Sequence, residues 1–143
     1  MRFNIRAYGQ PDEPLHPFDF GEIVLCDEET GRESGPLPPR RHYMAFVEIL
    51  IIHSLVVRAL HGEPYGTYTI SSSWETLAFD CAAGTVAFRF EGLTATMELH
   101  KALLALRAAM ERSLAMLAGY EDQEHSVILD LRDAINSGPA LVG

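Results

Sequence analysis

The sequence predicts an α+β fold, with a mostly antiparallel sheet of about five or six strands packed against a long buried helix and one or two C-terminal helices. Two observations carry this prediction. Segments in which every second residue is apolar occur near the N-terminus and again in the middle of the chain, and this alternation is typical of half-buried strands. Two longer stretches have apolar residues at helical spacing instead. The length of 143 residues suits a single domain over 1–143, because one hydrophobic core normally serves roughly 100 to 200 residues.

The first two strands are expected over residues 3–7 and 18–26. The first alternates between apolar and polar residues, as a strand with one buried face does. The second has apolar side chains on both faces, which predicts a central strand. An irregular segment rich in proline and glycine follows over 27–39, and its length favours a functional loop.

The long buried helix is expected from near Pro39 to Gly62, because proline suits the first helical position and glycine commonly ends a helix. Its apolar residues spread over more than half of the circumference, which predicts packing on several sides. Two polar residues, Glu48 and His53, interrupt this apolar surface.

Three further strands are expected over 65–70, 74–81 and 85–91, because short alternating runs are separated there by turn residues. The segment Leu93–Met97 is compatible with either a fourth strand or the start of a helix.

Two C-terminal helices are expected over 98–119 and 122–136. The first carries a stripe of leucine and methionine at helical spacing and ends at a glycine. The second has a shorter apolar stripe and ends at Ser137-Gly138-Pro139.

The net charge of −9, from 20 acidic and 11 basic residues, bears on the partners of the protein. No cluster of Lys and Arg is present, so we expect neither nucleic acid nor a membrane surface as a partner. No apolar stretch reaches the roughly 18 residues that a membrane span needs, and no secretory signal is recognisable. We therefore expect a cytoplasmic protein.

The acidic residues form two clusters, which predict an electrostatic docking surface for a basic protein partner. A solvated surface that only keeps the domain soluble is the simpler alternative. The main cluster consists of Asp27, Glu28, Glu29 and Glu33, and the second of Glu121, Asp122 and Glu124.

A pocket around the two polar residues of the long helix is the alternative site. Glu48 and His53 would act there as a general base or a switch, near Tyr68 and Trp74. Pairing with an arginine or a backbone carbonyl is the structural alternative, since buried polar groups need partners. The sequence contains no nucleophile elbow, phosphate-binding loop or metal-ligand spacing, so we predict no catalytic residue, no cofactor and no metal.

In size, acidity and mixed order of strands and helices, the chain resembles the small bacterial immunity proteins that neutralise a cognate toxin. The resemblance covers general architecture and transfers no individual residue. It implies a cytosolic, non-enzymatic inhibitor whose acidic surface blocks a positively charged cleft. The alternatives are a small enzyme or ligand-binding subunit, and a structural subunit of a homo-oligomer that associates through an apolar helix face or an exposed strand.

Overall fold

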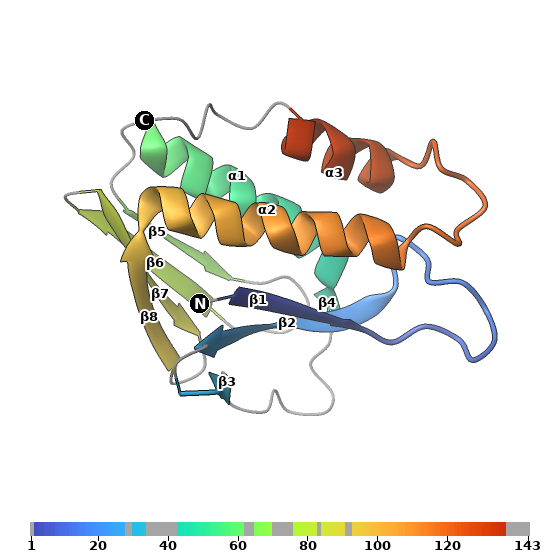
Figure 1. Ribbon diagram of the computed structural model, residues 1–143, viewed down its shortest axis with the longest axis horizontal. Coiled ribbons are helices and arrows are strands. Elements are labelled where there is room, and N and C mark those ends of the chain that lie inside the picture. The colour runs from blue at the N-terminus through green and yellow to red at the C-terminus, as the bar shows by residue number, and fades with distance from the viewer. Residues whose placement is uncertain are drawn as a thin grey trace.

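A computed structural model describes residues 2–27, 30–33, 43–61, 65–69, 76–82, 84–90 and 93–136. These residues form two separate antiparallel sheets and three helices (Figure 1). The elements alternate in blocks: strands, one helix, strands again, and two helices.

The first sheet consists of β1 (Arg2–Ala7), β2 (Phe20–Asp27), β3 (Arg32–Glu33) and β4 (Tyr43–Met44). The strands β1 and β2 pair along their whole common length, whereas β3 and β4 pair only with the two ends of β2. The sheet is therefore mainly a two-stranded ribbon, and β1 is an outer strand of it.

Gly21 shows why a side chain is not tolerated at one point of this ribbon. A Cβ atom built on Gly21 would overlap the backbone carbonyl oxygen of Arg6 on β1. The β1–β2 pairing thus depends on glycine at this position.

The second sheet is a meander of β5 (Tyr65–Thr69), β6 (Thr76–Ala82), β7 (Thr85–Phe90) and β8 (Leu93–Glu98). Each strand pairs antiparallel with the next one along the chain. Gly84 adopts a positive φ of 80° just before β7, a conformation that glycine adopts without strain. Leu93–Met97, which the sequence left open between strand and helix, lies in β8 and is a strand.

The helices are α1 (Ala45–Leu60), α2 (Leu99–Met116) and α3 (Ser126–Asn136). The helices α1 and α2 contact each other, and α3 contacts both. The helix α1 also contacts β1 and β2, whereas α2 contacts β1 and the strands β7 and β8 of the second sheet. Figure 1 shows α1 and α2 side by side, with α3 beyond them.

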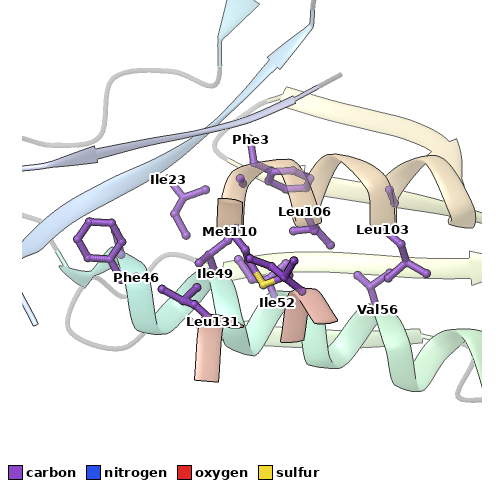
Figure 2. Packing of buried hydrophobic residues seen from close by; sticks show 14 of the residues in the cluster. Phe3, Ile23, Phe46, Ile49, Ile52, Val56, Leu103, Leu106, Met110 and Leu131 are labelled. Atoms are coloured by element: carbon purple, nitrogen blue, oxygen red, sulfur yellow. The ribbon is translucent and has the colours of Figure 1, made fainter. Parts of the chain in front are cut away.

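The buried core joins the two N-terminal strands to all three helices. Figure 2 shows side chains from β1, β2, α1, α2 and α3 meeting in one cluster. The predicted stripe on α2 contributes to it, since Leu103, Leu106 and Met110 are fully buried. Val86 of β7 also belongs to this cluster, so the second sheet touches the same core.

The prediction of one sheet with five or six strands is wrong. The described strands divide into two small sheets, and no pairing connects them. Alternating apolar residues indicate a strand. They do not indicate which other strand it pairs with, because pairing depends on tertiary packing.

Element boundaries also differ from the sequence expectations. The long helix begins at Ala45 rather than near Pro39, because Tyr43–Met44 pairs with β2 as a strand. The helix α2 ends at Met116, before Gly119, and the last helix begins at Ser126 rather than at residue 122. A connection over 117–125 therefore separates α2 from α3.

Candidate functional site

The main acidic cluster predicted from the sequence lies largely outside the described residues. Asp27 ends β2 and pairs with Arg32 across the ladder, and Glu33 ends β3. The side chains of these two acidic residues, and the whole of Glu28 and Glu29, are not described. This cluster stays a prediction.

The second acidic cluster is described and lies on the connection between α2 and α3. Glu121, Asp122 and Glu124 are all exposed there. The Oδ1 atom of Asp122 accepts a hydrogen bond from the backbone N–H of Glu124 at 3.0 Å. One carboxylate thus orders the backbone of the loop that carries the other two.

Gln123, between these acidic residues, fixes the connection to both helices. Its Nε2 group donates hydrogen bonds to the carbonyl oxygens of Leu117 and Tyr120, just beyond the end of α2. Its Oε1 atom accepts a bond of 3.2 Å from the guanidinium of Arg132 on α3. The same guanidinium also donates to the carbonyl oxygen of Gln123 at 3.3 Å. One amide side chain therefore adds a second bond to the Leu117 carbonyl, which also accepts from the backbone N–H of Tyr120 at 3.0 Å, and supplies a donor for the Tyr120 carbonyl.

A second loop, residues 8–19 between β1 and β2, lies against this connection. It starts where the backbone N–H of Tyr8 donates to the carbonyl of Phe20 at 2.8 Å. The Pro11–Asp12 turn is closed by a bond from Glu13 N–H to the Gln10 carbonyl, and Asp12 has a positive φ of 65°. This is the conformation of the third residue in a type II turn.

The end of the 8–19 loop is fixed by two reciprocal bonds. The backbone N–H of Asp19 donates to the carbonyl of His16 at 2.9 Å, and Asp19 Oδ2 accepts from His16 N–H at 2.7 Å. The Asp19 carboxylate lies so close to Gly9 that a Cβ atom there would stand 2.8 Å from Oδ2. The position of this carboxylate is thus set by backbone contacts on two sides.

The two loops enclose a surface cavity of about 310 Å³, which we call the acidic pocket. Its lining consists of Gln10, Glu13, Pro14, His16, Asp19, Gly119, Tyr120 and Glu121.

Aromatic rings join the two loops at this pocket. The ring of His16 lies 4.8 Å from that of Tyr120 and 5.6 Å from that of His125, both edge to face. Phe18 lies 4.8 Å from His125 in the same orientation. Such pairs stabilise a contact beyond the apolar area they bury. The loops therefore hold each other in place.

The two histidines of this group have the same hydrogen-bond arrangement. His16 Nδ1 accepts the backbone N–H of Phe18 at 3.0 Å, and His125 Nδ1 accepts that of Val127 at 3.1 Å. In a neutral imidazole with an accepting Nδ1, the proton is on Nε2. Both rings thus keep an N–H donor on the Nε2 side.

The charge of the site is of one sign. Segments 8–19 and 117–125 together contain six carboxylates and neither Lys nor Arg. These 21 residues account for six of the nine net negative charges of the chain. A pocket with acidic walls and aromatic edges is suited to holding a cationic group, through Coulomb attraction and through the negative faces of the rings.

Exposed aromatic side chains extend the site along the first sheet. Tyr8, Phe18 and Phe20 are each about half exposed. The Tyr8 hydroxyl donates to Oε1 of the buried Glu22 at 3.1 Å, and Arg6 lies 3.4 Å from the same oxygen. Burial, and then the hydrogen bond and charge of Glu22, raise the pKa of Tyr8.

The alternative pocket around the long helix has a different character. Glu48 is only 2% exposed and His53 only 8%. They lie about 140° apart around the helix axis, so they do not face a common point on α1. Neither lines the acidic pocket or the surface cavity between β1 and α2. Tyr68 lies on β5, but its side chain and Trp74 lie outside the described residues.

Two kinds of site are absent from the described segments. No three His, Cys, Asp or Glu side chains within them are grouped so that they could hold a metal ion. None of the described helices combines the length and the apolar character that crossing a membrane requires.

Several residues of the site were not predicted from the sequence, namely Glu13, His16, Asp19 and Tyr120 of the pocket lining and His125 of the aromatic group beside it. The sequence signal for this site is the composition of two short segments, 10–19 and 120–125. Each contains acidic residues together with an aromatic residue and a histidine. Their meeting depends on how the β1–β2 ribbon lies against α2, which one-dimensional patterns do not contain. No protein-family model, curated protein or solved structure matches this chain.

Proposed function

We propose that this chain is a non-enzymatic binding protein that captures a basic protein partner, with the acidic pocket receiving a Lys or Arg side chain of that partner. The observation that carries the proposal is the concentration of six carboxylates and no basic residue on the two loops that form the pocket.

The size of the pocket supports a single side chain as the ligand. Its volume of about 310 Å³ is at the lower end of the roughly 300–1,000 Å³ typical of small-molecule sites. A guanidinium or ammonium group on its aliphatic stem is of suitable size and charge. The Tyr120 ring at the pocket wall favours such a cation further.

The surroundings of the pocket support a protein rather than a small amine as the source of that side chain. Tyr8, Phe18 and Phe20 are exposed beside it, and aromatic side chains are enriched among the residues that dominate binding energy in protein interfaces. Fixed loops also reduce the entropy lost on binding. The aromatic contacts and the Gln123 hydrogen bonds provide this rigidity.

The small size and acidity of the chain favour one kind of binding protein in particular. This is an inhibitor of the immunity type, which would act in the cytoplasm on a toxin with a basic cleft. The carboxylates would then accelerate association as well as strengthen it, since steering by opposite charges raises association rates at low salt. The predicted cluster of Asp27, Glu28, Glu29 and Glu33 would form a second acidic surface, since Asp27 lies at the end of β2 away from the 8–19 loop.

The test compares two double variants with equal change in net charge. Glu13→Gln with Glu121→Gln removes two carboxylates of the pocket wall. Glu98→Gln with Glu111→Gln removes two exposed carboxylates that do not line the pocket. A labelled hexa-arginine peptide serves as the probe, and its binding is measured by fluorescence anisotropy.

We expect the pocket variant to weaken binding by about tenfold and the control variant to leave it within about twofold. Raising the salt from roughly 0.05 to 0.5 M should reduce binding by the unmodified protein, because screening shortens the range of the field. In a ¹⁵N NMR titration, the shifted amides should belong to 8–19 and 117–125. Equal losses in both double variants would show attraction to net charge alone and would refute the pocket.

A further inference from the structure

Three arginines line a second cavity, between the outer strand β1 and helix α2. Its volume is about 220 Å³, and we call it the arginine groove. Its lining consists of Arg2, Asn4, Ile5, Arg6, Ala109, Arg112 and Met116. The lining contains no Asp or Glu, in a chain with 20 acidic residues.

Toward the described residues, the side chains of Arg112 and Arg2 each make one hydrogen bond. Arg112 Nη2 donates to the carbonyl oxygen of Phe3 at 2.6 Å, which orients this guanidinium beside β1. Arg2 Nε donates to Oδ1 of Asn4 at 2.8 Å. A guanidinium has five N–H donors, so each of these two bonds occupies one donor of its group.

The balance of charge in the groove is positive. Arg6 lies 3.4 Å from Glu22, so one of the three positive charges is matched by a carboxylate. Glu111, next to Arg112 in sequence, is bonded to Arg107 at 3.2 Å. Partial burial, and then the charge of Arg2, lower the pKa of Arg112, against a smaller opposing effect of Glu111. Arg2 and Arg112 thus repel each other across the groove, and an anion between them would relieve this repulsion.

We propose that the arginine groove is a binding site for a phosphate group. A phosphate group has a charge of about −1.5 to −2 at pH 7, which matches the two guanidinium charges that Glu22 does not balance. Guanidinium groups bind phosphate oxygens through paired N–H donors, and three of them from two elements suit a tetrahedral ion better than a planar carboxylate. The volume of about 220 Å³ is below the roughly 300 Å³ at which sites for drug-sized ligands begin, so the site fits the phosphate group rather than a whole nucleotide.

The test is calorimetric titration with inorganic phosphate at pH 7.5, with ionic strength held constant by sodium chloride. We expect one site per chain. Arg112→Gln and Arg2→Gln should each weaken binding by about tenfold, because each removes a charge-assisted contact. Lys101→Gln is the matched control: it removes one positive charge from the same helix, at an exposed residue that does not line the groove.

Replacing Arg112 can lower stability through the lost bond to Phe3, so Arg2→Gln provides the second test. The Arg2 side chain is exposed, and among the described residues it is bonded to Asn4 alone. Phenyl phosphate and acetate complete the comparison. Binding of phenyl phosphate as well as inorganic phosphate would identify a phosphate carried on a larger molecule, and binding of inorganic phosphate alone would identify the free ion.

Absence of phosphate binding at millimolar concentration, an equal response to acetate, or an equal loss in Lys101→Gln would each overturn the proposal. The arginine groove is independent of the acidic pocket. The pocket variant Glu13→Gln with Glu121→Gln should therefore leave phosphate binding unchanged, and failure of one proposal leaves the other standing.

Discussion

His53 is a titratable side chain in the apolar interior of α1. It is 8% exposed, and its ring makes no hydrogen bond to another residue in the described part of the chain. Burial lowers the pKa of His53 below its ordinary value of 6.5, because a charged imidazole loses hydration there. The unfolded chain therefore takes up a proton at this residue before the folded chain does. Stability is lost as the pH falls below about 6.5 and towards the lower folded pKa.

Replacement of His53 by leucine should remove this contribution. In the native protein, the free energy of unfolding should decrease between pH 7.5 and 5.5 with a share from His53 of at most about 1.4 kcal/mol per pH unit. Urea denaturation at several pH values should give a flatter dependence for His53→Leu. His61→Leu, at an exposed residue just after α1, is the control and should keep the native slope. Parallel curves for the native protein and His53→Leu would contradict the prediction.

At the scale of elements, the connection between α2 and α3 shows where prediction from sequence reaches its limit. The apolar stripe continues through Leu114 and Leu117, so the periodicity predicts helix beyond the observed end at Met116. After Met116 the chain continues as turns, in which the Tyr120 N–H donates to the Leu117 carbonyl at 3.0 Å. The Gln123 side chain adds bonds to the Leu117 and Tyr120 carbonyls, and an apolar periodicity contains no signal for such polar contacts. The acidic residues on this connection were predicted, but the loop that meets them was not.

The Gln123–Arg132 contact should be a measurable source of stability. Gln123→Ala should lower the free energy of unfolding by about 1–2 kcal/mol, because it removes bonds to two carbonyl groups and to a guanidinium. Arg132→Met removes one side of the same network. The double variant should lose less than the sum of the two single variants, by about 0.5–1 kcal/mol. Additive effects in denaturant unfolding would show that the network does not act as a unit.

At the scale of the whole molecule, the core was more predictable than the sheets. Helical periodicity placed Leu103, Leu106 and Met110 on one face of a helix, and all three are buried. Local alternation also located β5, β6 and β7 of the second sheet, whereas it left β8 open between strand and helix. The division into two sheets was not predictable, because it depends on which strands pair. In the first sheet β1 pairs with β2 alone, and β5 to β8 pair only with one another.

Two leucines on α2 provide a matched test of this core. Leu106 is fully buried and Leu104 is 52% exposed. Leu106→Ala should lower the free energy of unfolding by about 2–5 kcal/mol, because the deleted atoms leave a cavity among residues from several elements. Leu104→Ala should change it by less than about 0.5 kcal/mol. Similar losses in the two variants, measured by thermal or urea denaturation, would contradict the assignment of the core.

The bond from Arg112 to the Phe3 carbonyl also affects how copies of the chain meet one another. An outer strand with open backbone groups is a template on which a strand of another molecule can add, and this is a common route to aggregation. On β1, a charged side chain from α2 occupies one of these backbone groups. A second copy would have to displace a guanidinium to extend the sheet there. The same arginine that contributes to the charge of the groove would thus compete with any strand that adds to β1 at Phe3.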